Sequence, residues 1–70
     1  MDQDFFEQFV DPQSFVPFVI TTVDGFAVPV PDLGHIITGR NLAVVKIAGG
    51  ILIHIPWRRI AHVTHKGELG

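Results

Sequence analysis

The sequence predicts a mainly β domain: a small five-stranded barrel preceded by a short N-terminal α-helix. Its 70 residues are enough for one domain and no more. Asp24-Gly25 joins two apolar runs within Phe15–Val30, and Gly49-Gly50 joins two further runs. Such pairs between strand-like runs are typical of β-hairpins with tight primed turns, in which both turn residues take a positive φ. Closing five short strands into a barrel would also remove exposed sheet edges.

The first segment, about residues 2–10, has the pattern of a short amphipathic helix. Asp2 or Asp4 can cap its first turn, and Pro12 disfavours helical geometry at the residue before it. We therefore expect the helix to end near Val10. A helix of this length does not persist alone in water, so its apolar face should lie on an open end of the barrel or, alternatively, on a partner. That face comprises Phe5, Phe6, Phe9 and Val10.

Strands are expected between about residues 15 and 65, and residues 66–70 as a frayed tail. Two breaks interrupt them: a turn at Pro31–Gly34 and a single 3₁₀ turn at Pro56–Arg59. The run Leu42–Ala48 is apolar except for Lys46. A strand of this kind is covered on both faces or buried in an interface.

The composition indicates a chain that associates with itself. Hydrophobic residues make up 47% of the sequence, charged residues only 17%, and the mean hydropathy is +0.39. A domain this small has too little interior to hide so many apolar side chains. We therefore predict a homo-oligomer, or a complex with another protein. The expected interface residues on the strands between Leu42 and Val63 are Leu42, Val44, Lys46, Leu52, His54, Ile60 and His62.

No targeting or membrane segment is expected. The start of the chain is acidic and lacks the basic and long apolar regions of a secretory signal. The most apolar stretch, Leu42–Trp57, is interrupted by Lys46, His54 and Pro56, which leaves it too short to span a bilayer. The sequence thus predicts a cytoplasmic protein that does not contact membranes.

Neither catalysis nor a cofactor is predicted. The chain has no cysteine, its carboxylates fall at turns or near the termini, and its only serine, Ser14, has no base beside it. His54, His62 and His65 suggest a metal site. However, residues three apart in a strand lie on opposite faces, so we predict no metal. Histidines at an interface would instead weaken assembly near pH 6.

A nucleic-acid site is the alternative. Trp57 beside two arginines has the character of a patch that binds phosphates and stacks on bases. In the competing interpretation, Trp57 fills one end of the barrel and the arginines solvate its rim. We favour this interpretation because four cations that form no continuous stripe are a weak sign of nucleic-acid binding. The residues of this candidate patch are Arg40, Lys46, Trp57, Arg58 and Arg59.

Two stretches resemble the SH3-like and Sm-like (Hfq-like) small barrels. Val23-Asp24-Gly25 resembles the end of the first Sm motif, and Ile53–Val63 resembles the strand, turn and strand of the second. The run Ser14–Gly25 is also similar to the opening of short bacterial small-barrel proteins that have no assigned activity. The resemblance implies rings in which the fourth strand of one subunit pairs with the fifth strand of the next. We expect a non-enzymatic assembly or protein-interaction module or, as the alternative, an Sm-like or Hfq-like RNA-binding protein.

Overall fold

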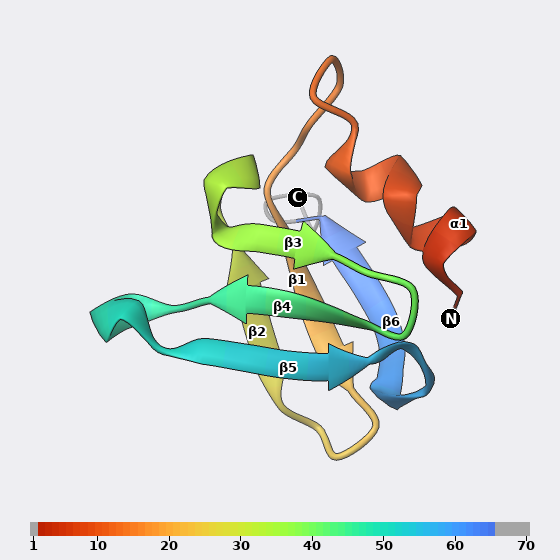
Figure 1. Ribbon diagram of the computed structural model, residues 1–70, viewed down its shortest axis with the longest axis vertical. Helices are drawn as coiled ribbons and strands as arrows, with labels where there is room; N and C mark the ends of the chain where they lie inside the picture. The colour runs from red at the N-terminus through yellow and green to blue at the C-terminus, as the bar shows by residue number, and fades with distance from the viewer. Residues whose placement is uncertain (1, 66–70) are drawn as a thin grey trace.

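The computed structural model describes residues 2–65, which form six strands behind a short helical segment (Figure 1). The expected tail at residues 66–70 lies outside the described residues. The helical segment is α1 (Gln3–Phe6), continued by the 3₁₀ turn η1 (Glu7–Val10). The strands are β1 (Phe18–Thr22), β2 (Ala27–Val30), β3 (Ile36–Thr38), β4 (Leu42–Lys46), β5 (Leu52–Pro56) and β6 (Ile60–His65). The 3₁₀ turns η2 (Leu33–His35), η3 (Ala48–Gly50) and η4 (Trp57–Arg59) connect them.

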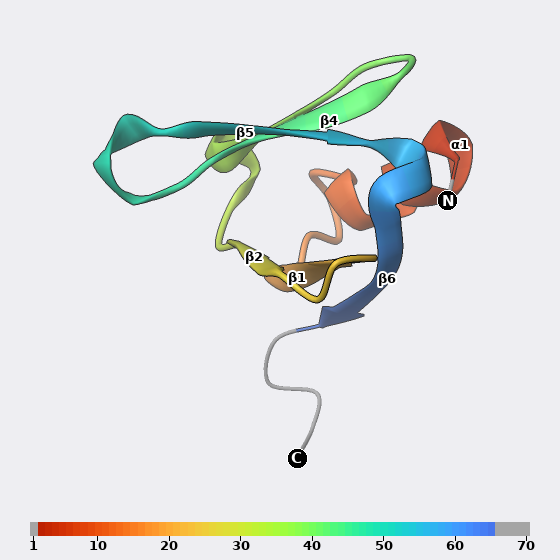
Figure 2. The same cartoon turned by 90° about the horizontal axis from the view of Figure 1, so that it is seen from below.

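The strands form two antiparallel sheets, ordered β2-β1-β6 and β3-β4-β5. The two sheets lie one over the other, and the strands of one cross the strands of the other (Figure 1). Figure 2 shows them from the side as two layers. The mainly β fold with a short N-terminal helix is therefore confirmed. Within residues 2–65 the strands number six rather than five, and their pairing does not close the two sheets into a barrel. Pro31 and the 3₁₀ turn that follows it separate β2 from β3, because proline offers no donor to a ladder.

The β1–β2 hairpin forms where the sequence predicts it, but its turn differs. The Gly25 amide donates to the Thr22 carbonyl at 2.9 Å, and the Thr22 amide donates to the Phe26 carbonyl at 2.9 Å. Gly25 has φ 92°, and no non-glycine residue in the described chain has a positive φ. The loop thus has three residues and ends in a bulge at glycine, and the prediction of a primed turn with Asp24 at positive φ is wrong.

The β4–β5 hairpin repeats this hydrogen-bond pattern. The Ile47 amide donates to the Ile51 carbonyl at 2.8 Å, and the Gly50 amide donates to the Ile47 carbonyl at 3.1 Å. Gly49 and Gly50 have φ 83° and 76°, in the region that residues with a Cβ rarely adopt. The second hairpin predicted from the glycine pair is confirmed.

The helical segment begins at a capped residue and ends where expected. The Asp2 carboxylate accepts a hydrogen bond from the Phe5 amide at 2.8 Å, and the last helical residue is Val10. Its ring contacts reach β1 and η4, and the Glu7 carboxylate accepts a 2.6 Å hydrogen bond from the Thr38 hydroxyl on β3. The segment therefore lies against the sheets (Figure 1), with Phe6 fully buried and Phe5 49% exposed.

The core lies between the two sheets and under the helical segment. It draws on the inward positions of the strands and on two aromatic residues from outside them, Phe6 and Trp57, whose ring centroids are 5.1 Å apart. The Trp57 indole donates to the carbonyls of Gly39 and Arg40 at 3.0 and 2.9 Å, so its polar atom is satisfied inside the molecule. The buried residues are Phe6, Phe18, Ile20, Val28, Val30, Ile36, Ala43, Val45, Ile55, Trp57 and Ile60.

Candidate functional site

Five of the seven predicted interface residues share one surface, the outer face of the β3-β4-β5 sheet. Val44 pairs with His54 and Lys46 pairs with Leu52, and residues directly opposite each other in a sheet project to the same side. The alternate residues of these strands, such as Ala43 and Val45, point into the core. This surface, the outer face, comprises Ile37, Leu42, Val44, Lys46, Leu52 and His54.

Ile37 belongs to this face, although it is not among the interface residues expected from the sequence. It pairs with Val44 across β3 and β4 and is 71% exposed. Its signal in the sequence is weak, because Ile36 and Ile37 are both isoleucine and β3 has only three residues. The pairing with β4, which sets Ile36 inward, identifies the side that Ile37 occupies.

The other two predicted interface residues lie elsewhere. Ile60 is 4% exposed and belongs to the core, so its selection as an interface residue is wrong. It starts β6 directly after the 3₁₀ turn η4, which turns the chain into the core at this point. His62 is exposed but pairs with Thr21 in the other sheet. The apolar run to Val63 therefore spans two sheets rather than one surface.

A groove runs along the inner side of β5. It has a volume of about 260 Å³ and lies between the end of β5 and the β1–β2 hairpin. Phe26, on its hairpin side, is 68% exposed. Asp24 and Arg59 form an ion pair within the groove, about half-exposed on both sides. The lining of this β5 groove is Thr22, Asp24, Phe26, Ala27, Val28, Ile53, His54, Ile55, Pro56 and Arg59.

The backbone of β5 is unpaired on one side. Within the described chain, β5 pairs with β4 alone. In an antiparallel pair of strands, hydrogen-bonded residue pairs alternate with pairs that are not hydrogen-bonded. Because Ile47 and Ile51 are hydrogen-bonded, the backbones of Ile53 and Ile55 also bond to β4. Leu52 and His54 then direct their amides and carbonyls away from β4, toward the free edge.

Of the remaining strand edges, those of β2 and β3 are less open than that of β6. In β2, backbone groups that bond to β1 alternate with groups that point to the free edge, and the bond between Thr22 and Phe26 fixes this alternation. Pro29 falls at a position that points to the free edge, so the edge lacks a donor there. Strand β3 has only three residues. Strand β6 has six residues and contains no proline, and within residues 2–65 it pairs with β1 alone. The free edges that can accept another strand are thus those of β5 and β6.

The candidate nucleic-acid residues do not form one patch. Trp57 is 7% exposed and packs on Phe6, so no base can stack on it. Arg40 precedes β4 and Lys46 ends it, which separates these two cations by the length of the strand. Arg58 and Arg59 are exposed on η4, as expected if they solvate the rim around Trp57.

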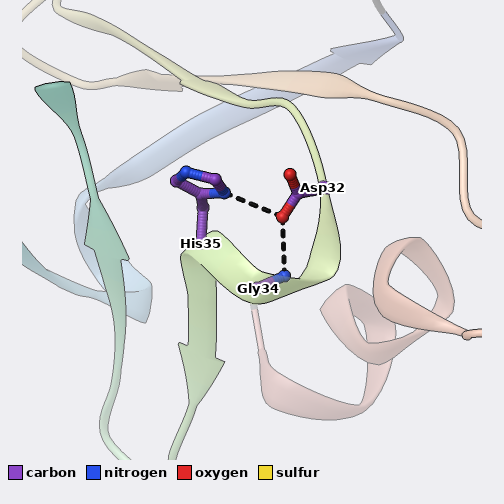
Figure 3. A network of polar contacts seen from close by, with 3 residues as sticks. All are labelled: Asp32, Gly34 and His35. Atoms are coloured by element: carbon purple, nitrogen blue, oxygen red, sulfur yellow. Dashed lines mark hydrogen bonds and ion pairs between the residues drawn. The ribbon is translucent and has the colours of Figure 1, made fainter.

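A second hollow lies beside the turn of the β4–β5 hairpin. Beside it, the Asp32 carboxylate accepts hydrogen bonds from the Gly34 amide and from Nδ1 of His35, both at 2.8 Å (Figure 3). The pKa of the Asp32 carboxyl lies below its ordinary value, mainly because the carboxylate accepts the hydrogen bond from His35. Asp32 thus caps η2 and orients the imidazole in the same contact.

Other classes of site are not indicated by the described residues. Among residues 2–65, no three histidine or carboxylate side chains are grouped so that they could hold a metal ion. The same residues include no helix long and apolar enough to cross a membrane. Comparisons with protein-family models, curated proteins and solved structures give no significant match.

Proposed function

We propose that this protein is a non-enzymatic, self-associating small β domain of the SH3-like or Sm-like type, which acts as an assembly or protein-interaction module. The observation that carries the proposal is the position of β5. It is a free edge strand with exposed apolar surface on both of its sides. A strand laid along it would gain backbone hydrogen bonds and cover both surfaces at once.

The first of these surfaces is the outer face. Ile37 is 71% exposed and Leu52 is 56% exposed, and Val44 lies between them in the sheet. The second is the β5 groove, where Phe26 is 68% exposed. Burying apolar area is favourable by about 25 cal/mol per Å². Covering these large side chains gives association its driving force.

The strand we assign to this edge is β6 of a second copy. It is the longest strand of the described chain, has no proline and has its own free edge. If β2 and β3 are counted as the two halves of one bent strand, β5 and β6 are the fourth and fifth strands, which is the pair that the Sm-like resemblance implies. Because the two edges differ, the contact is head-to-tail and leads to a ring if the rotation closes.

The experiment blocks the free edge without touching the fold of the monomer. His54→Pro removes only an outward amide, so the ladder to β4 keeps its hydrogen bonds. We expect the mass measured by light scattering to fall to that of one chain, while circular dichroism and Trp57 fluorescence stay native. His54→Val is the matched control, because it changes the same side chain and keeps the amide.

A second control tests the strand register. Ile53→Pro removes an amide that bonds to Val45, so this variant should lose the native fold as well as assembly. If His54→Pro has the same mass as His54→Val, pairing at this edge is refuted. A wild-type protein that stays monomeric at millimolar concentration would refute self-association altogether.

A further inference from the structure

The second hollow, beside the turn of the β4–β5 hairpin, has its own walls, separate from the β5 groove. Its volume is about 340 Å³, and no residue lines both hollows. One side is formed by prolines at the end of β2, and the other by the β4–β5 hairpin. Two ionisable residues, His35 and Lys46, belong to its lining. The complete lining is Pro29, Pro31, His35, Lys46, Ile47, Ala48, Gly49 and Gly50.

His35 is held through one of its two ring nitrogens. Asp32 is ionised at neutral pH and can only accept, so Nδ1 of His35 carries the proton in their hydrogen bond. The other nitrogen, Nε2, faces away from Asp32 (Figure 3). A carboxylate partner of this kind fixes the tautomer and the orientation of an imidazole. Nε2 accepts a hydrogen bond when the ring is neutral and donates one when the ring is protonated.

Lys46 brings an uncompensated positive charge to the same place. The pairing of β3 with β4 ends at Ile36–Val45, and the next residue of each segment, His35 and Lys46, lines the hollow. The ion pairs among residues 2–65 are those of Asp32 with His35 and of Asp24 with Arg59, so Lys46 has no carboxylate partner there. Its ammonium can therefore meet an anion without first breaking an internal salt bridge.

We propose that this hollow binds a small organic carboxylate. The oxyanion would lie between the Lys46 ammonium and Nε2 of His35, and the carbon chain would lie against Pro29, Pro31 and Ile47. The mixture of two polar groups with an otherwise apolar wall is typical of small-molecule sites. The charges near the hollow are those of Lys46, His35 and Asp32, and they sum to zero when the imidazole is neutral and to +1 when it is protonated.

The test is an NMR titration of ¹⁵N-labelled protein with sodium butyrate at constant ionic strength. We expect saturable shifts of the amides of His35 and residues 46–50, and tighter binding at pH 6.0 than at pH 7.5. Lys46→Met should weaken binding about threefold to tenfold. Arg58→Met removes an equal charge outside the hollow and should leave the affinity unchanged. His35→Gln should keep the fold and abolish the pH dependence.

Two further ligands separate the parts of the site. 1-Butanol should not saturate, because it lacks the charge, and inorganic phosphate should bind more weakly than butyrate, because it lacks the carbon chain. Absence of saturable shifts with butyrate, or equal weakening by Lys46→Met and Arg58→Met, would overturn the proposal. Phosphate that binds as tightly as butyrate would overturn the assignment to organic carboxylates. None of these outcomes depends on self-association, since His54→Pro can be titrated in the same way.

Discussion

Trp57 shows how one residue decides between two interpretations of the same sequence. In the sequence, its place beside Arg58 and Arg59 is compatible both with stacking on a base and with filling the end of the barrel, the interpretation that we favour. The structure buries its ring against Phe6 and satisfies its indole with two backbone carbonyls of the β3–β4 turn. Trp57 therefore ties η4 to that turn, and the arginines remain at the surface.

The contribution of this contact can be measured with Trp57→Phe. The variant loses the indole donor and leaves a small cavity, so we expect the free energy of unfolding to fall by about 2 kcal/mol. Urea denaturation gives this value from the midpoint and slope. Arg58→Ala, at the exposed neighbouring position, should change stability by less than about 0.5 kcal/mol. Equal stability of Trp57→Phe and the wild type would show that the indole contacts do not hold the turn.

At the level of elements, the N-terminal segment is held by packing rather than by helical propensity. Its α-helical part is a single turn of four residues, followed by a 3₁₀ turn of four. Such a short helix does not form alone in water. Phe6 supplies the anchor through ring contacts with Phe18 and Trp57, and the bond between Glu7 and Thr38 fixes the segment beside β3.

Two adjacent phenylalanines allow a matched test of this anchor. Phe6→Ala should destabilise the protein by about 3–5 kcal/mol, because the side chain is fully buried. Phe5→Ala, at a position that is 49% exposed, should cost less than about 1 kcal/mol. Where Phe6→Ala does not fold, Phe6→Leu serves instead, with an expected loss of about 1 kcal/mol. Similar losses at both positions would mean that the segment docks through a different face.

On the scale of the whole molecule, the distribution of prolines decides which strand edges stay open. Pro29 removes a donor from the free edge of β2, whereas β5 presents Leu52 and His54 before Pro56 ends it. The exposed apolar side chains Ile37 and Leu52 flank this open edge. In the function proposed above, the open, apolar edge of β5 gains more from a second copy than from solvent.

Self-association should therefore stabilise the fold by mass action. We expect the thermal midpoint of the wild type to rise with protein concentration, since dilution releases monomers that unfold more easily. The His54→Pro variant, which lacks the edge donor, should melt at the same temperature at every concentration. Calorimetry over a hundredfold range of concentration checks both. A midpoint independent of concentration in the wild type would contradict assembly as a source of stability.

The sequence by itself determined the local elements: the helix end at Val10, the two glycine hairpins and the 3₁₀ turn after Pro56. Glycine, proline and alternating side chains act within a few residues, so their effects can be predicted without knowing what packs against them. Only the tertiary structure divided the strands between two sheets. It also decided that Ile60 points inward while Ile37 and Leu52 point outward. Register across strands is set by contacts between residues far apart in the chain, and a shift of one residue would exchange these faces. For the same reason, only the folded chain brings His35 and Lys46 to one hollow and leaves β5 open on the other side.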